Sequence, residues 1–237
     1  MPNLKYTRAV LKLSGEVLAG EVGHGIDFDL TGRICSHVME CVCAGAQLGV
    51  VIGGGNFWRG RSSGSMDAVR ADKMGMLATM MNALALADQL RQLGVETLVQ
   101  SAHVMPQFAG CVDKEQAVRA LEQGKVVIFG GGTGNPFFTT DSAAALRAAE
   151  IEAEVVLKAT NVDGVYDKDP RKFADAKKYD ALTHGEVLEQ RLGVMDATCA
   201  ALCREKALPM LVFNLGDPGN ILRALMGENV GTVVTVE

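Results

Sequence analysis

The stretch VVIGGGN at residues 50–56 is an apolar run of strand length that ends in three glycines. The stretch VIFGGGTGN at residues 127–135 repeats the pattern. Apolar runs of this length, separated by segments of helical period, are typical of an α/β protein with a mainly parallel sheet between two layers of helices. Ligands of such sheets bind beyond the carboxyl ends of the strands, which is where these glycines lie.

The same alternation extends over the whole chain. We expect strands at 9–13, 48–52, 97–100, 126–129, 154–158 and 210–214, with a short closing strand at 232–236. Helices are expected at 30–44, 67–93, 114–123, 142–150, 186–191, 197–206 and 220–226. No repeat, low-complexity tract or linker interrupts this order, so residues 1–237 are predicted to form a single domain.

Composition excludes several classes of protein. The chain has 237 residues, a net charge of -5 and 48% hydrophobic residues, which suffices for a core without a metal or disulfide staple. Acidic and basic residues are mixed, so we expect no nucleic acid polymer as partner. No apolar run is long enough to span a bilayer and the first ten residues contain no apolar leader. A cytoplasmic protein without membrane contact is predicted.

Six cysteines form no C-x-x-C pair and lie among apolar residues: Cys35, Cys41, Cys43, Cys111, Cys199 and Cys203. We interpret them as reduced core cysteines of a reducing compartment. The alternative is a metal site, because His37 and Cys41 share one helix face and Cys199 and Cys203 share another. The core interpretation is favoured, since structural zinc sites usually have tighter paired spacing. No metal ligands are therefore assigned.

The helix expected at 67–93 has apolar residues three and four positions apart. These are Met74, Leu77, Met81, Leu84 and Ala85. Such a pattern usually marks the face of a helix that packs on the core. A contact between subunits is the alternative.

The two triglycine loops indicate phosphate ligands. Without Cβ atoms, backbone N–H groups can approach anionic oxygens closely. A tight turn could explain either loop, but the pair favours two phosphorylated ligands or one long one. Lys12 near the end of the first strand would add positive charge, although a snorkelling lysine is the plainer explanation for that residue alone. Glu21 stands where a Walker A loop needs lysine, and no G-x-G-x-x-G follows a strand.

The loop after the second triglycine is rich in polar side chains. It runs Thr133-Gly134-Asn135-Pro136-Phe137-Phe138-Thr139-Thr140-Asp141 and leads into a helix. Thr140 or Asp141 could simply cap that helix. Three threonines, an amide and a carboxylate are more than a cap needs, however, and predict recognition of a nucleotide. Downstream, Lys158 ends another strand and Tyr166 follows in a polar turn that could hold an adenine.

These motifs resemble the bacterial uridylate kinases of the amino acid kinase superfamily. The resemblance rests on Lys12-Leu13-Ser14-Gly15, Gly53-Gly54-Gly55-Asn56, the stretch 132–141, Lys158-Ala159-Thr160 and Val162-Asp163-Gly164-Val165-Tyr166. It covers nearly the whole chain, and the T-G-N-P-F-F-T-T-D stretch is its most specific part. It implies a sandwich around a mainly parallel sheet of about eight strands, and phosphorylation of UMP to UDP by ATP in pyrimidine nucleotide biosynthesis.

The resemblance also implies site residues. The catalytic set would be Lys12, Arg59, Asp141 and Lys158. ATP would be bound by Lys12, Leu13, Ser14, Gly15, Gly55, Arg59, Thr160, Asn161, Tyr166 and Asp169. UMP would be bound by Gly54, Asp72, Thr133, Gly134, Asn135, Pro136, Phe137, Phe138, Thr139 and Thr140, with Asp72 on the ribose. The segment Gly20, Glu21, Val22, Gly23, His24 and Gly25 resembles an activator-associated loop.

Further expectations follow from the resemblance. Mg2+ would accompany ATP, with few protein ligands. A homohexamer is implied, with GTP and UTP as effectors, and dUMP and CMP stay open as minor acceptors. The nearest alternative is a relative that phosphorylates a carboxylate or carbamate, but Asp72, Asn135 and three threonines suit a base and a ribose better. A nucleotide-binding storage or sensor protein would be expected to lack the cluster of charged residues.

Overall fold

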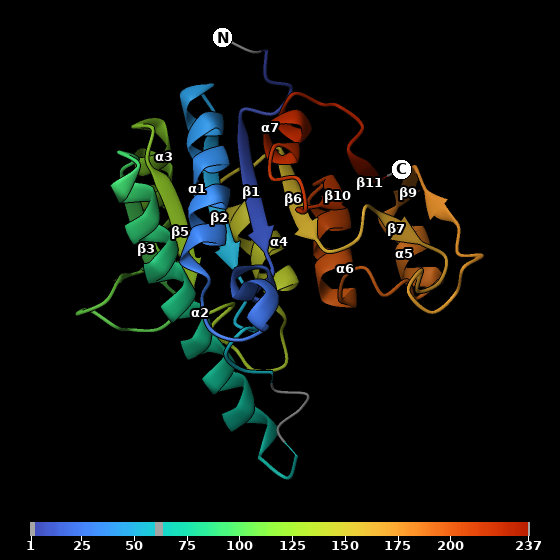
Figure 1. The fold of residues 1–237 in the computed structure, drawn as a ribbon, viewed down its shortest axis with the longest axis horizontal. Helices are drawn as coiled ribbons and strands as arrows, with labels where there is room; N and C mark the ends of the chain where they lie inside the picture. The colour runs from blue at the N-terminus through green and yellow to red at the C-terminus, as the bar shows by residue number, and fades with distance from the viewer. Residues whose placement is uncertain (1–2, 60–63, 237) are drawn as a thin grey trace.

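A central sheet of nine strands dominates the computed structural model, which describes residues 3–59 and 64–236 (Figure 1). The strands follow the order β4-β3-β5-β2-β1-β6-β10-β11-β9, and only the β10–β11 pair is antiparallel. Their bounds are β1 Arg8–Leu13, β2 Gln47–Ile52, β3 Thr97–Ser101, β4 Gly110–Cys111, β5 Val126–Gly130, β6 Val155–Thr160, β9 Ala181–Thr183, β10 Met210–Asn214 and β11 Gly231–Thr235. The predicted mainly parallel sheet is confirmed.

Helices cover both faces of the sheet (Figure 1). One face carries α1 Phe28–Cys43, α2 Ala68–Gln92 and α7 Asn220–Leu225. The other carries α3 Lys114–Glu122, α4 Thr140–Glu150, α5 His184–Glu189 and α6 Ala197–Glu205. These layers confirm the predicted three-layer sandwich. In the part of the chain that the structure describes, no helix has the length and apolar character needed to cross a membrane.

Each of the seven strands and seven helices expected from the sequence is present, with ends that differ by a few residues. The elements not predicted are short. They are the 3-10 segment η1 Gly15–Val22, the strands β4 and β9, and the hairpin of β7 Val165–Tyr166 with β8 Lys178–Tyr179. Strands of two or three residues are too short for a periodic signal, so their sequences read as loop.

The central strand β1 carries a charged residue, Lys12, next to its carboxyl end, and its apolar residues pack into the cores on the two faces of the sheet. Leu11 and Leu13 pack into the core under α1 and α2, whereas Val10 packs into the opposite core. Lys12 shares the face of Val10 because side chains alternate along a strand. Its side chain is nonetheless 12% exposed, since β1 ends there and opens into the loop that begins at Ser14. The sheet thus presents this ammonium group at its carboxyl edge.

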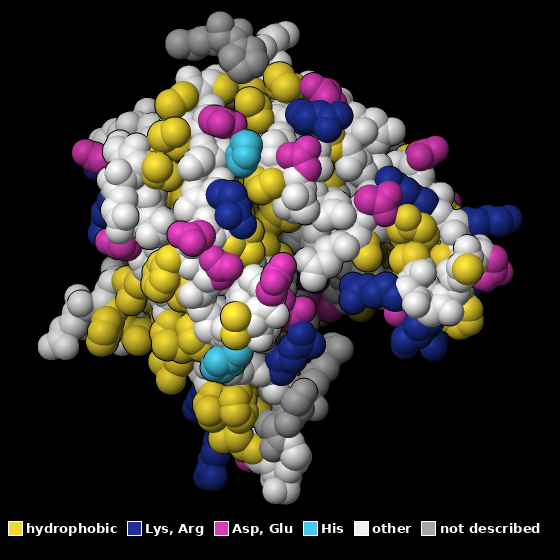
Figure 2. All heavy atoms as spheres, viewed as in Figure 1, with side chains coloured by type: hydrophobic (Ala, Val, Ile, Leu, Met, Phe, Trp, Pro, Cys, Tyr) yellow, Lys and Arg dark blue, Asp and Glu magenta, His cyan; other side chains and the backbone are white. Residues whose placement is uncertain are grey.

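The apolar face of α2 differs from the prediction. Met74, Leu77, Met81 and Leu84 are 38%, 55%, 48% and 37% exposed, so the expectation that they form core was wrong. Figure 2 shows hydrophobic side chains gathered over α2. The helix buries a different face, on which Met80, Leu86 and Leu90 pack into the core together with several alanines and the polar residues Thr79 and Asn82. An exposed stripe of this kind fits the alternative, a contact between subunits.

The cysteines divide into two groups. Cys35, Cys41, Cys199 and Cys203 are buried as predicted, and burial raises the pKa of the Cys35 and Cys41 thiols to about 12. Cys43 and Cys111 are exposed, so the core prediction was wrong for these two. Cys43 ends α1, and Cys111 belongs to the two-residue edge strand β4. Among the described residues, no three His, Cys, Asp or Glu side chains gather as metal ligands would.

Candidate active site

Two lysines and an aspartate meet at the carboxyl edge of the sheet. Lys12 of β1 and Lys158 of β6 are register partners on adjacent parallel strands. Asp141, the second residue of α4, lies against both: its Oδ1 atom is 2.9 Å from Lys12 Nζ, and its Oδ2 atom accepts a hydrogen bond from Lys158 Nζ. The three side chains are only 8 to 13% exposed. Three of the four predicted catalytic residues therefore form one cluster.

The cluster perturbs its own ionisation. Burial would raise the pKa of Asp141, but the charges of Lys158 and Lys12 together outweigh it and hold that pKa below its ordinary value. Burial lowers the pKa of Lys158, and the neighbouring Lys12 lowers it too, against the opposing effect of Asp141. The carboxylate is therefore ionised at neutral pH, and Lys158 loses its proton more readily than an ordinary lysine. One carboxylate between two ammonium groups leaves net positive charge for an anionic ligand.

The start of α4 is held by a network that the sequence did not reveal. Thr139 is the N-cap, and its hydroxyl accepts from the backbone N–H of Asp141, so the capping explanation applies to Thr139 and not to the two residues after it. The carboxylate of Asp196 accepts hydrogen bonds from the hydroxyls of Thr139 and Ser142. Asp196 also caps α6. In the sequence, Asp196 stands directly before an expected helix. That position is fully explained by helix capping, so it did not point to the site.

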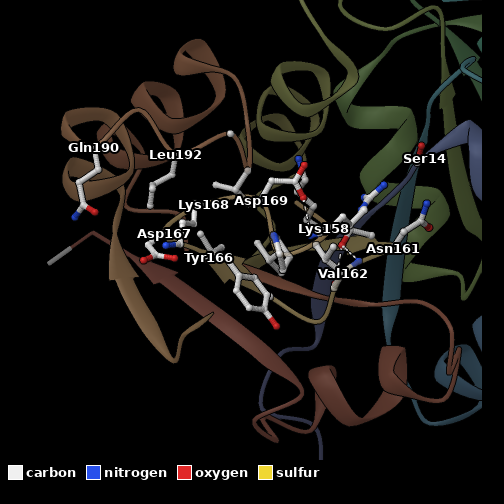
Figure 3. A pocket seen from close by; sticks show the side chains of 18 of the residues that line it. Ser14, Lys158, Asn161, Val162, Tyr166, Asp167, Lys168, Asp169, Gln190 and Leu192 are labelled. Atoms are coloured by element: carbon white, nitrogen blue, oxygen red, sulfur yellow. Dashed lines mark hydrogen bonds between the residues drawn. The ribbon is translucent and has the colours of Figure 1, made fainter. Parts of the chain in front are cut away.

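A pocket of about 590 Å³ opens beside the two lysines, and we call it the larger pocket because it is the larger of the two pockets that flank the start of α4. Six of the residues predicted for ATP line it: Lys12, Ser14, Thr160, Asn161, Tyr166 and Asp169. Figure 3 shows Ser14, Lys158 and Asn161 at one end and Gln190 and Leu192 at the other, with Tyr166 between them. The wall at residues 190–194 was not predicted, because this connection between α5 and α6 carries no recognisable motif.

Four other residues predicted for ATP lie outside the larger pocket. The side chain of Leu13 is buried in the core. Gly15 packs against the first triglycine loop, where an added Cβ would lie 2.5 Å from the carbonyl oxygen of Gly53. Gly55 lies beside Glu16, and Arg59 is ion-paired with that same carboxylate. Arg59 is therefore apart from the lysine–aspartate cluster, unlike the other three predicted catalytic residues.

A second cavity, of about 270 Å³, lies between α2 and the two triglycine loops, and we call it the smaller pocket. Six residues predicted for UMP line it: Gly54, Asp72, Thr133, Phe138, Thr139 and Thr140. Gly132, from the second triglycine loop predicted to bind phosphate, also lines it, whereas sequence reasoning missed the remaining wall, formed by Trp58, Ala71, Gly75, Met76 and Thr79. Most of these belong to α2, whose small residues gave no functional signal.

The rest of the predicted UMP loop lies at the rim. Gly134, Asn135, Pro136 and Phe137 do not line the smaller pocket. Phe137 is 76% exposed and has a φ of 71°, a left-handed conformation that is strained for a bulky residue. Its backbone N–H donates to Asp72 Oδ2 at 2.7 Å. Asp72 therefore holds this loop against α2 in addition to facing the pocket.

The two pockets meet at the start of α4. Thr139 and Thr140 line the smaller pocket, while Asp141 contacts the two lysines that line the larger one. Two ligands whose anionic ends point at this helix N-terminus would be brought together beside two ammonium groups. Such an arrangement suits transfer of a phosphoryl group between them.

Comparison with known proteins agrees with this geometry. Residues 7–214 match the model of the amino acid kinase family. The chain belongs to the amino acid kinase family.

Solved structures of this family are similar over nearly the entire chain. UMP kinase from Bacillus anthracis is 36% identical with a TM-score of 0.94, and the match covers 98% of this chain and 97% of that one. UMP kinase from Ureaplasma parvum is 40% identical with a TM-score of 0.91, covering 98% and 100%. Uridylate kinase from Archaeoglobus fulgidus is 32% identical with a TM-score of 0.72, covering 96% and 99%. The resemblance predicted from the sequence is confirmed.

In this amino acid kinase the predicted activator-associated segment connects to the first triglycine loop. Gly25 exchanges hydrogen bonds with Asn56, through its N–H at 3.1 Å and its carbonyl at 2.7 Å. The ring of His24 lies edge-on to Phe57, 5.8 Å between centroids. Gly20 and Glu21 line a separate groove of about 720 Å³ between η1 and α1, and Val22 is 85% exposed. An effector role for residues 20–25 stays a prediction.

Proposed function

We propose that this enzyme transfers the γ-phosphoryl group of ATP to UMP, forming UDP and ADP. The observation that carries the proposal is the meeting of two pockets at the Lys12–Asp141–Lys158 cluster. The larger pocket has the size and the mixed polar and aromatic lining that suit ATP, and the smaller pocket suits a nucleoside monophosphate. The similar structures from Bacillus anthracis and Ureaplasma parvum are UMP kinases, which favours UMP as the acceptor.

The proposed step needs little covalent help from the protein. An oxygen of the UMP phosphate forms a bond to the γ-phosphorus of ATP, while the bond from that phosphorus to the β,γ-bridging oxygen breaks and ADP leaves. The acceptor phosphate is already ionised near neutral pH, so no general base is required. Lys12 and Lys158 would stabilise the charge on the transferring oxygens, and Asp141 would fix the two ammonium groups. Arg59 would reach the phosphates after leaving Glu16.

The residues of the site fit a magnesium ion carried by ATP. Asp141 Oδ1 is buried and ion-paired with Lys12 but accepts no hydrogen bond among the described residues. It could therefore accept one from a water molecule bound to Mg2+. The ion would supply charge neutralisation between the phosphates and would be held mainly by phosphate oxygens. Direct coordination by Asp141 is disfavoured, since Lys158 already occupies its other oxygen.

The proposal includes a cellular role and an assembly. UDP formation would supply pyrimidine nucleotide biosynthesis in the cytoplasm. A homohexamer is proposed because α2 exposes Met74, Leu77, Met81 and Leu84, an apolar stripe that a second subunit could cover. GTP and UTP are proposed as effectors, acting through residues 20–25. The contact of Gly25 with Asn56 supports a route from that segment to the first triglycine loop.

A screen of acceptors tests the activity. ADP release would be measured by a coupled assay with ATP, Mg2+ and one acceptor at a time: UMP, dUMP, CMP, AMP, GMP, acetylglutamate or carbamate. We expect the highest kcat/KM with UMP. Activity on acetylglutamate or carbamate and none on UMP would overturn the assignment. ATP binding without turnover on any acceptor would indicate a nucleotide sensor instead.

A further inference from the structure

Helix α2 carries two buried polar side chains on the face that it turns toward the sheet. Thr79 is 3% exposed and Asn82 is fully buried. They lie three residues apart, so they are neighbours on one face of the helix. A buried hydroxyl and a buried amide are costly unless they are hydrogen-bonded, and an apolar residue would pack there at lower cost. The hydrogen-bond partners of Thr79 and Asn82 therefore indicate the role of these two side chains.

Thr79 binds the second triglycine loop. Its hydroxyl donates to the carbonyl of Met76 and accepts from the backbone N–H of Gly131, each at 2.7 Å. Gly131 has a φ of 79° and stands in the turn between β5 and the predicted UMP loop. The hydroxyl of Thr79 thus fixes the distance between α2 and the start of that loop.

Asn82 binds the first triglycine loop. Its Nδ2 atom donates to the carbonyl oxygen of Gly53 and to Asn56 Oδ1, both at 2.7 Å. Its Oδ1 atom accepts from Asn56 Nδ2 at 2.9 Å. Both N–H groups of the Asn82 amide therefore donate to residues of the first triglycine loop, and the side-chain amides of Asn82 and Asn56 donate to each other. This network fixes the loop that follows β2.

Glycines let both loops lie directly on α2. A Cβ added at Gly54 would lie 2.8 Å from the Cβ of Ala78 and 2.8 Å from the carbonyl oxygen of Gly75. A Cβ added at Gly130 would lie 2.3 Å from the sulfur of Met80. Gly54 is thus needed for close packing on the helix as well as for the approach of a ligand, and Gly130 leaves room for the side chain of Met80.

We propose that Thr79 and Asn82 are positioning residues that fix the two triglycine loops relative to each other. The inference rests on the proposed function, in which both loops line the smaller pocket, through Gly54 and Gly132, beside the point of phosphoryl transfer. Phosphoryl transfer requires acceptor oxygen, phosphorus and leaving oxygen in line, and a displacement of about 1 Å can cost ~10²-fold in rate. A single rigid helix bonded to both loops sets that alignment. Neither side chain needs to touch the reacting atoms.

The test replaces the hydroxyl without changing the volume. Thr79→Val removes the acceptor for Gly131, and Thr79→Ser keeps it. We expect Thr79→Val to lower kcat ~10-fold or more. Because Thr79 also lines the smaller pocket, the Kd for UMP is followed separately by fluorescence of Trp58, and the loss of kcat should exceed any loss of UMP affinity. Thr79→Ser should restore kcat to within ~3-fold of wild type.

A matched control separates positioning from stability. Thr31 of α1 is also fully buried, and its hydroxyl donates to the carbonyl of Asp27 at 2.7 Å. Thr31→Val should leave kcat near wild type even if its melting temperature falls as far as that of Thr79→Val. Equal losses of kcat in Thr31→Val and Thr79→Val, or wild-type kcat in Thr79→Val, would overturn the proposal.

Hydrogen exchange at Gly131 tests the link without any substrate. The amide of Gly131 should exchange faster in Thr79→Val than in wild type and in Thr79→Ser. Faster exchange in a protein that phosphorylates no UMP would refute the proposed function but leave the loop contact standing. Unchanged exchange would refute the contact itself. If Thr79→Val does not fold, Thr79→Ala removes the same hydroxyl and is judged by the same two measurements.

Discussion

Lys12 and Lys158 occupy paired positions on two adjacent parallel strands, so their side chains leave the sheet side by side. Like charges at such a pair are destabilising, and here the pair is also largely buried. Asp141 compensates by contacting both ammonium groups. The arrangement places one negative and two positive charges where the two pockets meet. This excess of positive charge is the electrostatic basis of the proposed transfer.

The first prediction concerns Lys12. Lys12→Ala should lower kcat by ~10²-fold or more, because a group aimed at charge that develops in the transition state is lost. Steady-state kinetics with ATP and UMP measures this loss. Lys125→Ala serves as the control, since Lys125 pairs with Glu96 near the amino ends of β3 and β5, at the opposite edge of the sheet. Wild-type turnover in Lys12→Ala would remove this residue from the mechanism.

The second prediction concerns the pH dependence set by Asp141. The pKa of Lys158 already lies below its ordinary value because the side chain is buried, and Asp141 is the group that opposes this shift. Asp141→Asn removes the opposing charge, so the pKa of Lys158 should fall further. Lys158 must be protonated to act as a cation. The alkaline limb of the pH profile of kcat/KM should therefore move to lower pH in the variant.

The matched control for this profile is Glu96→Gln. It also removes a carboxylate from a lysine, in the exposed pair with Lys125. Its alkaline limb should coincide with that of the wild type. An Asp141→Asn profile with an unmoved or more alkaline limb would contradict the role assigned to the cluster.

Local patterns were enough to predict the layers, because most of the long strands are largely apolar and most of the helices have a capping residue or a clear period. They were also enough to predict both triglycine loops and the lysines near them. The buried face of α2 was not predictable in this way, since Ala and Met occur all around that helix. What distinguishes the inner face is Thr79 and Asn82, whose partners Gly131 and Gly53 lie 52 and 29 residues away in the sequence.

Asp196 was missed for a related reason. Its carboxylate acts on Thr139 and Ser142, more than 50 residues earlier in the chain. In the sequence it is indistinguishable from an ordinary helix cap, which it also is. Residues that organise a site through long-range hydrogen bonds therefore need the fold before they can be recognised.

The third prediction concerns Asp72 and the rim of the smaller pocket. Asp72→Asn should chiefly raise the KM for UMP, because contacts with the ribose are made equally in the ground state and the transition state. The N–H of Phe137 should still find an acceptor in the asparagine oxygen. Asp72→Ala loses that acceptor as well and should raise the KM further, since the strained loop at Phe137 is released. Unchanged KM with collapsed kcat in Asp72→Asn would contradict this role.

The fourth prediction concerns the exposed stripe of α2. Leu77 and Met81 lie one turn apart on this helix and are 55% and 48% exposed. A surface of this kind is normally covered by another protein surface, and the cost of burying charge there is high. The double variant Leu77→Glu, Met81→Glu should therefore sediment as a smaller species than the wild type. Analytical ultracentrifugation over a range of micromolar concentrations measures the difference.

The control for this experiment places a negative charge of the same kind, one glutamate in place of two, on an exposed apolar residue away from α2. Phe173 is 49% exposed and lies in the loop between β7 and β8. Phe173→Glu should sediment like the wild type if the stripe is the contact.

Since α2 also holds Thr79 and Asn82, a subunit on the stripe would pack against the back of the helix that fixes both triglycine loops. Loss of the assembly should then lower kcat in the double variant, whereas a monomeric wild type with full activity would refute the stripe as a functional interface.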